Sequence, residues 1–321
     1  MNSKTGIAVV GSVLVDRLCE IGAYPNIGEL TTIRNLSLSV GGLVPNDTID
    51  LKKIAPDLPV FAYGKIGNDD LGQYVLDTLQ KHGVRTDGIR IDDSEHTGFT
   101  DVMSVVGGQR TFFTYSGGNS FFGYDDIDWE RMSARMLHLG YFLLLDKIDV
   151  GDGLRILQEA KSRGIQTSID LVSEHSDRYS LVLPCLPYVD NLIVNELEAC
   201  KLCGMDVSEE ELPTVAEKLL RAGVRERVII HTPKQAVCRN REELTVLQSY
   251  ELPQGWIQGT TGAGDAFCSG ALVGIYYGKS DAEILEYAQM AAVASLRSTD
   301  ATGGLKELNE LKEHTKTLSR I

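Results

Sequence analysis

Short apolar runs recur along the chain, each bounded by glycine or polar residues. Runs of this length predict strands that are buried on both faces of a sheet. They occupy residues 7–10, 60–64, 137–145, 165–171, 188–194 and 226–231. The first run ends at Gly11, which would bring its carboxyl end to a site.

Between these runs, apolar side chains recur every three or four residues, which predicts amphipathic helices. Such helices are predicted over residues 71–79, 151–163 and 267–276, and from 304 onward. Gly164 ends the second of them. Alternating strands and helices predict an α/β fold with a mainly parallel sheet, helices on both faces, and ligands beyond the carboxyl ends of the strands.

A different pattern, in which apolar and polar positions alternate, predicts half-exposed strands. It covers residues 30–40. Residues 98–106 and 110–115, joined by Gly107 and Gly108, predict a β-hairpin with a glycine turn. These segments are therefore expected outside the fully buried sheet.

The charge balance narrows the choice of partners. The chain has 321 residues, with 31 Lys plus Arg against 45 Asp plus Glu, so its formal charge is −14. This acidity argues against nucleic acid or an anionic membrane as the main partner, and no apolar run approaches the length that spans a bilayer. Any anionic substrate must be held by local donors.

The cysteines indicate a reducing compartment. They are scattered, and the chain starts without the basic and apolar regions of a signal peptide, so we expect a cytoplasmic protein. One pair has the spacing of a metal or redox motif, but it has no second pair and falls within a predicted helix, so we interpret it as structural. The six are Cys19, Cys185, Cys200, Cys203, Cys238 and Cys268.

The loop that enters the helix after residue 262 is a candidate anion site. The first N–H groups of a helix lack internal partners and carry partial positive charge. Gly262, Ala263 and Gly264 have little side chain to keep a phosphate away from them. Asp265 would repel that phosphate, unless it accepts the proton of an attacking hydroxyl. A plain structural turn with an acidic first helical residue is the alternative.

Two further stretches carry candidate ligands. The paired glycines Gly41 and Gly42 would let backbone amides approach a polyol, and Asn46 offers both a donor and an acceptor. Asn195 and Glu198 have the spacing of a capping box. The same pair, one amide and one carboxylate, also suits a hydrated Mg²⁺ ion, so both roles stay open.

The stretch from Thr260 to Phe267, Thr-Thr-Gly-Ala-Gly-Asp-Ala-Phe, resembles the C-terminal signature of the ribokinase-like (PfkB-type) carbohydrate kinases. The Gly-Gly-x-x-x-Asn and Asn-x-x-Glu stretches match other motifs of that family, in the family's order. The resemblance covers nearly the whole chain. It implies one ribokinase-like three-layer domain over residues 1–321, with a small β-sheet lid formed by residues 12–40 and 96–118.

The resemblance also implies an activity, which is transfer of the γ-phosphoryl group of ATP to a hydroxymethyl group of a sugar. Asp265 would be the base, and the backbone N–H groups of Gly262, Ala263 and Gly264 would stabilise charge on the phosphoryl oxygens. A carboxylate at a helix N-terminus should have a lowered pKa, which we expect for Asp265. Dimerisation through the lid is a further expectation.

The implied ligands follow from the matching positions. Substrate contacts fall on Asp16, Gly41, Gly42, Asn46 and Asn119. Two further candidates do not rest on a matching position. Arg110 could reach an anionic or polyhydroxy substrate, and Asp170 lies near the carboxyl end of a predicted strand. Nucleotide contacts fall on Asn195, Thr232, Thr261, Gly262 and Gly264, and the Mg²⁺ ligands are Asn195 and Glu198.

The sequence departs from the family pattern at several positions. Pro233 and Ala236 stand where many members carry a Gly-x-x-Gly near the nucleotide, and Gly259 replaces an aspartate that helps to hold a monovalent ion in cation-activated members. Asp47 and Thr48 replace smaller residues beside the asparagine. The donor nucleotide and K⁺ activation are therefore open. A nucleoside kinase and a catalytically weak sugar-binding or regulatory protein stay as alternatives.

Overall fold

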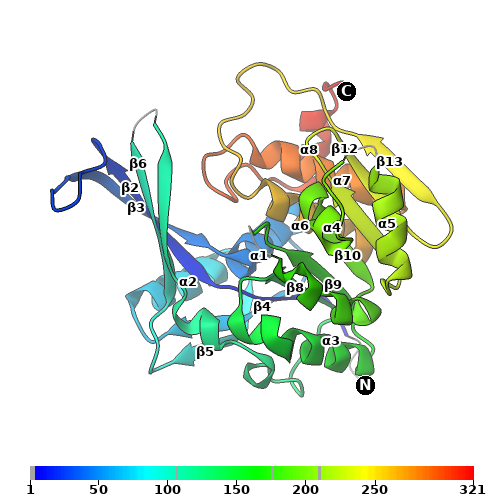
Figure 1. The fold of residues 1–321 in the computed structure, drawn as a ribbon, viewed down its shortest axis with the longest axis horizontal. Coiled ribbons are helices and arrows are strands. Elements are labelled where there is room, and N and C mark those ends of the chain that lie inside the picture. Colours follow the sequence, from blue (N-terminus) through cyan, green and yellow to red (C-terminus); the bar gives the residue numbers. More distant parts are fainter. Residues whose placement is uncertain (1–3, 106–107, 175–176, 209–210) are drawn as a thin grey trace.

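The computed structural model of the protein describes residues 4–105, 108–174, 177–208 and 211–321. Within these ranges, nine strands form one large sheet and four form a smaller one (Figure 1). The large sheet contains β1 (Ile7–Val10), β4 (Val60–Gly67), β5 (Arg85–Asp92), β8 (Met136–Phe142), β9 (Gln166–Leu171), β10 (Asn191–Asn195), β11 (Arg227–His231), β12 (Gln235–Arg239) and β13 (Leu244–Gln248).

The large sheet is mainly parallel, as predicted. Its order is β13-β12-β11-β10-β9-β8-β1-β4-β5. Every neighbouring pair from β11 to β5 is parallel, whereas β12 and β13 extend the edge as antiparallel strands. The carboxyl ends of the parallel strands therefore meet at one edge.

Helices cover both faces of this sheet, and β1 shows why. Ile7 and Val9 pack into one hydrophobic core, while Ala8 and Val10 pack into the other. A strand buried on both faces must be apolar at every position. The first core is shared with α1 (Leu43–Ile54), α2 (Asp70–Lys81), α6 (Ala263–Tyr276) and α7 (Asp281–Ser295), and the second with α3 (Gly153–Ser162), α4 (Glu196–Leu202) and α5 (Leu212–Arg221).

Some boundaries differ from the predictions. Strand β4 continues through Gly67, where a loop was expected, because Gly64–Gly67 pair with β5. The strand predicted from residue 188 begins only at Asn191, since a 3-10 helix occupies Leu183–Tyr188. The last helix is α8 (Leu308–Thr315). Every helix in the described ranges is too short or too polar to cross a bilayer.

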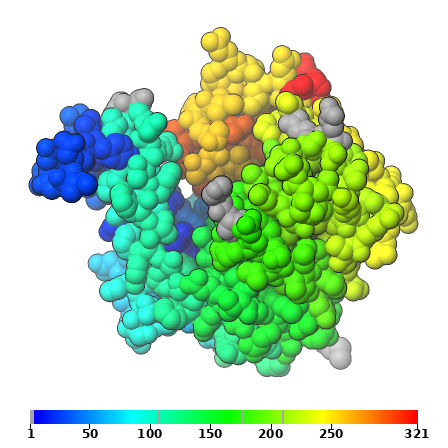
Figure 2. Space-filling model, in the orientation of Figure 1, coloured from blue at the N-terminus to red at the C-terminus, as the bar shows by residue number. Residues whose placement is uncertain are grey.

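The smaller sheet comes from the two predicted insertions. It contains β2 (Leu14–Ile21), β3 (Ile33–Gly41), β6 (Gly98–Val105) and β7 (Arg110–Tyr115), in the order β3-β2-β6-β7. The predicted hairpin is present as the antiparallel pair β6 and β7, although Gly107 in its turn lies outside the described residues. Figure 2 shows this sheet standing away from the body, with a hollow between them. Its action as a lid, a single domain and a lid dimer stay predictions.

Candidate functional site

The start of α6 forms the predicted bare helix N-terminus. Gly262 has a φ of 79°, and a Cβ there would lie 2.5 Å from the Ala301 carbonyl oxygen, so this turn requires glycine. At Gly264, by contrast, a Cβ would meet no described atom within 4 Å. No described side chain caps the helix, which leaves its first N–H groups available to an anion.

Asp265 is the third residue of α6 and is 7% exposed. The Asn46 amide donates a hydrogen bond of 2.8 Å to its Oδ2, and the Tyr141 hydroxyl donates one of 2.9 Å to its Oδ1. Burial raises the pKa of Asp265 to about 6, and the negative charge of Asp170 adds to this, against the two hydrogen bonds. The expected lowering was wrong, because burial outweighs the helix terminus.

Asn46 reaches Asp265 because α1 begins in a tight turn. Gly42 has a φ of 81°, and a Cβ there would lie 2.9 Å from the Ser12 carbonyl oxygen. Ser12 in turn accepts a hydrogen bond of 3.1 Å from the Leu43 N–H through its Oγ. A Cβ at Gly41 would collide with the carboxylate of Asp16. The two glycines thus permit close packing, and their predicted contact with a substrate stays a prediction.

Asp16 lies in a polar row across the smaller sheet. Its cross-strand partners are Ser39 on β3 and Thr100 on β6, and Thr100 is paired in turn with Thr114 on β7. The Oγ1 atoms of the two threonines are 3.1 Å apart. Burial raises the pKa of Asp16 to about 6. Residues in register share one face of a sheet, so these groups face the same way.

Asp170 ends β9 and accepts a hydrogen bond of 2.6 Å from the Tyr141 N–H. It lines a small cavity of about 70 Å³ together with Asp265, Asn195 and Glu198. The structure therefore brings the predicted base, a predicted substrate ligand and the predicted metal ligands to one place. They come from the ends of β9 and β10 and from the first turns of α4 and α6.

Asn195 and Glu198 form the predicted capping box of α4. The Asn195 Oδ1 accepts from the Glu198 N–H at 2.9 Å, and the Glu198 Oε2 accepts from the Asn195 N–H at 3.1 Å. Ser173 links them, since its hydroxyl accepts from the Asn195 amide and donates to Glu198. Burial raises the pKa of Glu198 to about 7, although the bond from Ser173 opposes the shift.

A larger cavity of about 530 Å³ lies on the other side of the α6 start. Among the predicted nucleotide contacts, Asn195, Thr232 and Gly264 line it. Thr261, which is exposed, and Gly262 are both absent from its lining. The Thr232 Oγ1 accepts from the N–H groups of Lys234 and Gln235, at 3.0 Å each, and so closes the turn after β11. The apolar part of the wall includes Leu252, Ile257, Phe267, Val293 and Leu296.

Two predicted substrate ligands lie elsewhere. The Asn119 amide is engaged with the backbone of Val13 and Ser116 through three hydrogen bonds of 2.8–3.0 Å. Arg110 is exposed at the start of β7, opposite Ser104. That is four residues along the sheet from the Asp16 row, or about 13 Å. Substrate binding by either side chain stays a prediction.

Sequence reasoning missed Tyr141, whose hydroxyl is held against Asp265. Its φ of 54° is uncommon for a residue other than glycine. The apolar run over residues 137–145 predicted a strand, and a polar group at the end of a parallel strand is a place to look for ligand contacts. No local pattern indicated its partner, which lies 124 residues away.

Comparison with known proteins agrees with this fold. The chain is 26% identical to the ribokinase of Arabidopsis thaliana over 320 residues, which cover 97% of this chain and 80% of the relative. It is 24% identical to the adenosine kinase of Saccharomyces cerevisiae, covering 89% and 86% of the two chains. The structure of Arabidopsis thaliana ribokinase with ribose and ATP superposes with a TM-score of 0.84, at 24% identity and coverage of 97% and 98%.

A match to one family as a whole covers nearly the same length of the chain. The description "pfkB family carbohydrate kinase" fits residues 4–308, which include every strand of both sheets. The chain belongs to the pfkB family of carbohydrate kinases.

Proposed function

We propose that this protein transfers the γ-phosphoryl group of ATP to a hydroxymethyl group of a sugar, with Asp265 as the base. One observation carries the proposal. The large and the small cavity share Asn195, His231 and Gly264 as lining residues, so they meet at the N-terminus of α6. A donor in one cavity and an acceptor in the other would face each other across the helix N–H groups.

The larger cavity suits the nucleotide. Its apolar wall matches a purine ring, and the solved relative from Arabidopsis thaliana binds ATP. The phosphates would then lie at Ala263 and Gly264, where the helix N–H groups favour negative charge. Because no described atom occupies the space beside Gly264, a phosphoryl group can approach the backbone there.

Asn195 and Glu198 fit a hydrated Mg²⁺ ion by their donor atoms and by their position, since Asn195 lines both cavities and Glu198 lines the small one. Their mutual capping bonds use only part of the capacity of the carboxylate. A Mg²⁺ ion bound there would neutralise charge on the nucleotide phosphates. The protein contributes the orientation, because Ser173 holds both side chains.

Asp265 would accept the proton of the attacking hydroxyl, and Asn46 and Tyr141 would hold its carboxylate in position. The Asn46 Oδ1 is buried without a partner among the described residues. A buried acceptor left unpaired costs about 1–3 kcal/mol, which a substrate hydroxyl could recover. Asp16 and Asp170 supply further acceptors for sugar hydroxyls, and closure of the smaller sheet would exclude water.

A nucleoside kinase is the second candidate, since a curated relative is an adenosine kinase.

Gly259 bears on whether a monovalent cation is needed, whichever substrate is used. A Cβ there would lie 2.6 Å from the Ser298 carbonyl oxygen, so an aspartate does not fit without a shift. We therefore propose that activity does not depend on K⁺, which replacement of K⁺ by Na⁺ would test.

The experiment is ADP release with ATP and Mg²⁺ across sugars, sugar acids, sugar phosphates and nucleosides, with Asp265→Asn alongside. The proposal expects turnover with a sugar, lost in the variant. Faster turnover with a nucleoside would move the substrate class to the second candidate. Sugar binding by calorimetry without ATP binding or turnover would favour a binding protein and contradict the proposal.

A further inference from the structure

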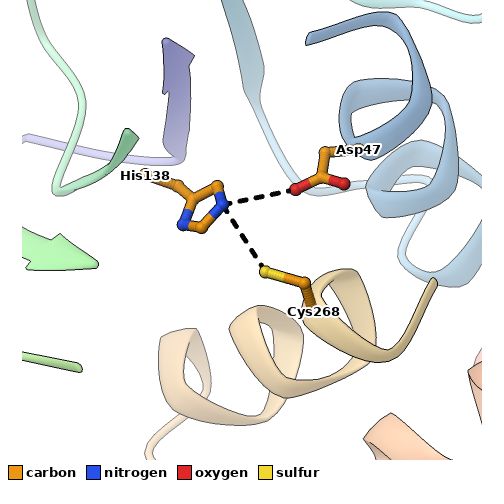
Figure 3. Close-up of side chains that lie close together, drawn as sticks. All are labelled: Asp47, His138 and Cys268. Carbon is orange, nitrogen blue, oxygen red and sulfur yellow. Dashed lines mark hydrogen bonds and ion pairs between the residues drawn. The ribbon is translucent and has the colours of Figure 1, made fainter. Parts of the chain in front are cut away.

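Three buried side chains lie next to the small cavity, which one of them, Cys268, also lines, and they have no role in the proposed transfer. Figure 3 shows Asp47 from α1, His138 from β8 and Cys268 from α6 pointing toward one another. Asp47 and His138 are 0% exposed, and Cys268 is 2% exposed. One atom able to bind a metal from each residue lies within 4.8 Å of the other two. The group joins three elements that are far apart in the sequence.

The distances within the group suit a shared ion. His138 Nε2 lies 3.5 Å from Asp47 Oδ2 and 3.5 Å from Cys268 Sγ. In a tetrahedral Zn²⁺ site, whose bonds are about 2.0–2.3 Å long, neighbouring ligand atoms lie about 3.3–3.7 Å apart. A direct hydrogen bond between nitrogen and oxygen is shorter, at about 2.9 Å. The two distances from His138 therefore match the spacing of a coordination sphere, and the third pair of ligand atoms lies within 4.8 Å.

The surroundings of the Asp47 carboxylate are a second observation in favour of a bound cation. Neither of its carboxylate oxygens makes a hydrogen bond of ordinary geometry with a described residue, and its polar neighbours are the Cys268 thiol and His138 Nε2. A buried carboxylate without a partner is costly, and buried charges are normally paired or bind metals. A cation between Asp47 and its two neighbours would remove that cost.

His138 is oriented as a metal ligand would be. Its Nδ1 lies 2.9 Å from the Ser168 Oγ. When Nδ1–H donates to this hydroxyl, Nε2 presents its lone pair to Asp47 and Cys268. A hydrogen bond from the second ring nitrogen is the usual support of a histidine that binds a metal.

We propose that Asp47, His138 and Cys268 bind a Zn²⁺ ion that ties α1, β8 and α6 together beside the active site. A thiolate and an imidazole favour Zn²⁺ over Mg²⁺ or Ca²⁺. Binding releases the thiol proton of Cys268 to solvent, and the ligands are then one thiolate, one carboxylate and one neutral imidazole. Their two negative charges balance the ion. Asp170 Oδ2, 3.8 Å from His138 Nε2, lies near the fourth position.

The test is metal uptake by the folded protein. Chelator-treated wild type is titrated with Co²⁺, which reports a thiolate ligand by a charge-transfer band, and with Zn²⁺, followed by metal analysis and thermal unfolding. We expect equimolar binding, a thiolate band and a higher Tm with Zn²⁺. Cys268→Ser should lose the band, and Asp47→Asn should bind at least about tenfold more weakly.

Two control variants separate this site from others. Cys185→Ser removes another buried cysteine, and Glu198→Gln alters the proposed Mg²⁺ site; both should keep the band and the stoichiometry. Should Cys268→Ser fail to fold, the wild-type titration decides alone. No metal uptake by the folded wild type would overturn the proposal. It would mean that Asp47, His138 and Cys268 are held together by shared protons and not by a metal ion. Equal Co²⁺ binding by wild type and Cys268→Ser would indicate an adventitious ion only.

Discussion

Helices α4 and α6 each carry a buried acid as their third residue, and the two acids are held differently. Glu198 of α4 returns to its own N-cap, Asn195, and completes a capping box. Asp265 of α6 follows Gly262, which has no side chain to cap the helix. Its carboxylate is held instead by Asn46 and Tyr141, from other elements.

The two ways of holding the acid suit two different roles. The capping box satisfies backbone groups locally and fixes Glu198 in the wall of the small cavity. At α6, the glycine cap leaves the helix N–H groups available to an anion and leaves the acid available for proton transfer. A third helix, α7 (Asp281–Ser295), supplies a reference, because Glu283 is also a third residue in a capping box but is only half-buried.

The largest effect is expected at the acid of α6. Asp265→Asn keeps the size of the side chain and removes the base, so kcat should fall by about 10²- to 10⁴-fold. Steady-state ADP release with the preferred sugar measures it. Glu283→Gln is the matched control and should retain the wild-type rate, since that residue is remote from both cavities. Full activity in Asp265→Asn would show that Asp265 is not the base.

Replacing Glu198, the acid of α4, should lower activity less than replacing Asp265, and the effect should arise through weaker Mg²⁺ binding. Glu198→Gln removes a charge but can still accept the capping bond, so we expect the Mg²⁺ concentration for half-maximal rate to rise by about 10- to 100-fold. Activity against Mg²⁺ at fixed ATP measures the shift. An unchanged Mg²⁺ requirement, with lower stability alone, would reduce Glu198 to a capping role.

Alanine substitutions at the two glycines at the start of α6 should affect different properties, ATP binding in one case and stability in the other. Gly264→Ala adds a Cβ where the protein leaves space, so we expect a stable protein whose KM for ATP rises by about tenfold, or about 1.4 kcal/mol. Gly262→Ala strains a left-handed turn and meets Ala301, so it should lose about 1–3 kcal/mol of unfolding free energy. Urea unfolding and ATP titration distinguish them, and the reverse pattern would contradict the phosphate position.

Local signals predicted much of the fold and part of the site. The short runs of apolar residues predicted the parallel strands, and the spacing of Asn195 and Glu198 predicted their capping box. The small residues from 262 to 264 predicted the exposed helix start. Each of these signals lies within one element, where spacing along the chain equals spacing in the molecule.

The remaining features depend on contacts between distant residues. The bond from Tyr141 to Asp265 joins positions 124 residues apart, and His138 and Cys268 meet across 130 residues. Sequence spacing says nothing about either contact. The sign of the Asp265 pKa shift was mistaken for the same reason, because the helix terminus is visible in the sequence whereas burial by α1 and β8 is not.

The most direct test of Asp265 as the base is the dependence of kcat/KM on pH. Burial and the neighbouring charge of Asp170 raise the pKa of Asp265 to about 6, and only the ionised carboxylate can accept a proton. The rate should therefore fall as the pH drops below about 6. The fall should be less steep in the residual activity of Asp265→Asn, where Asp16 and Glu198 still titrate near this range. The same acidic limb in wild type and variant would show that another group titrates and would contradict the account.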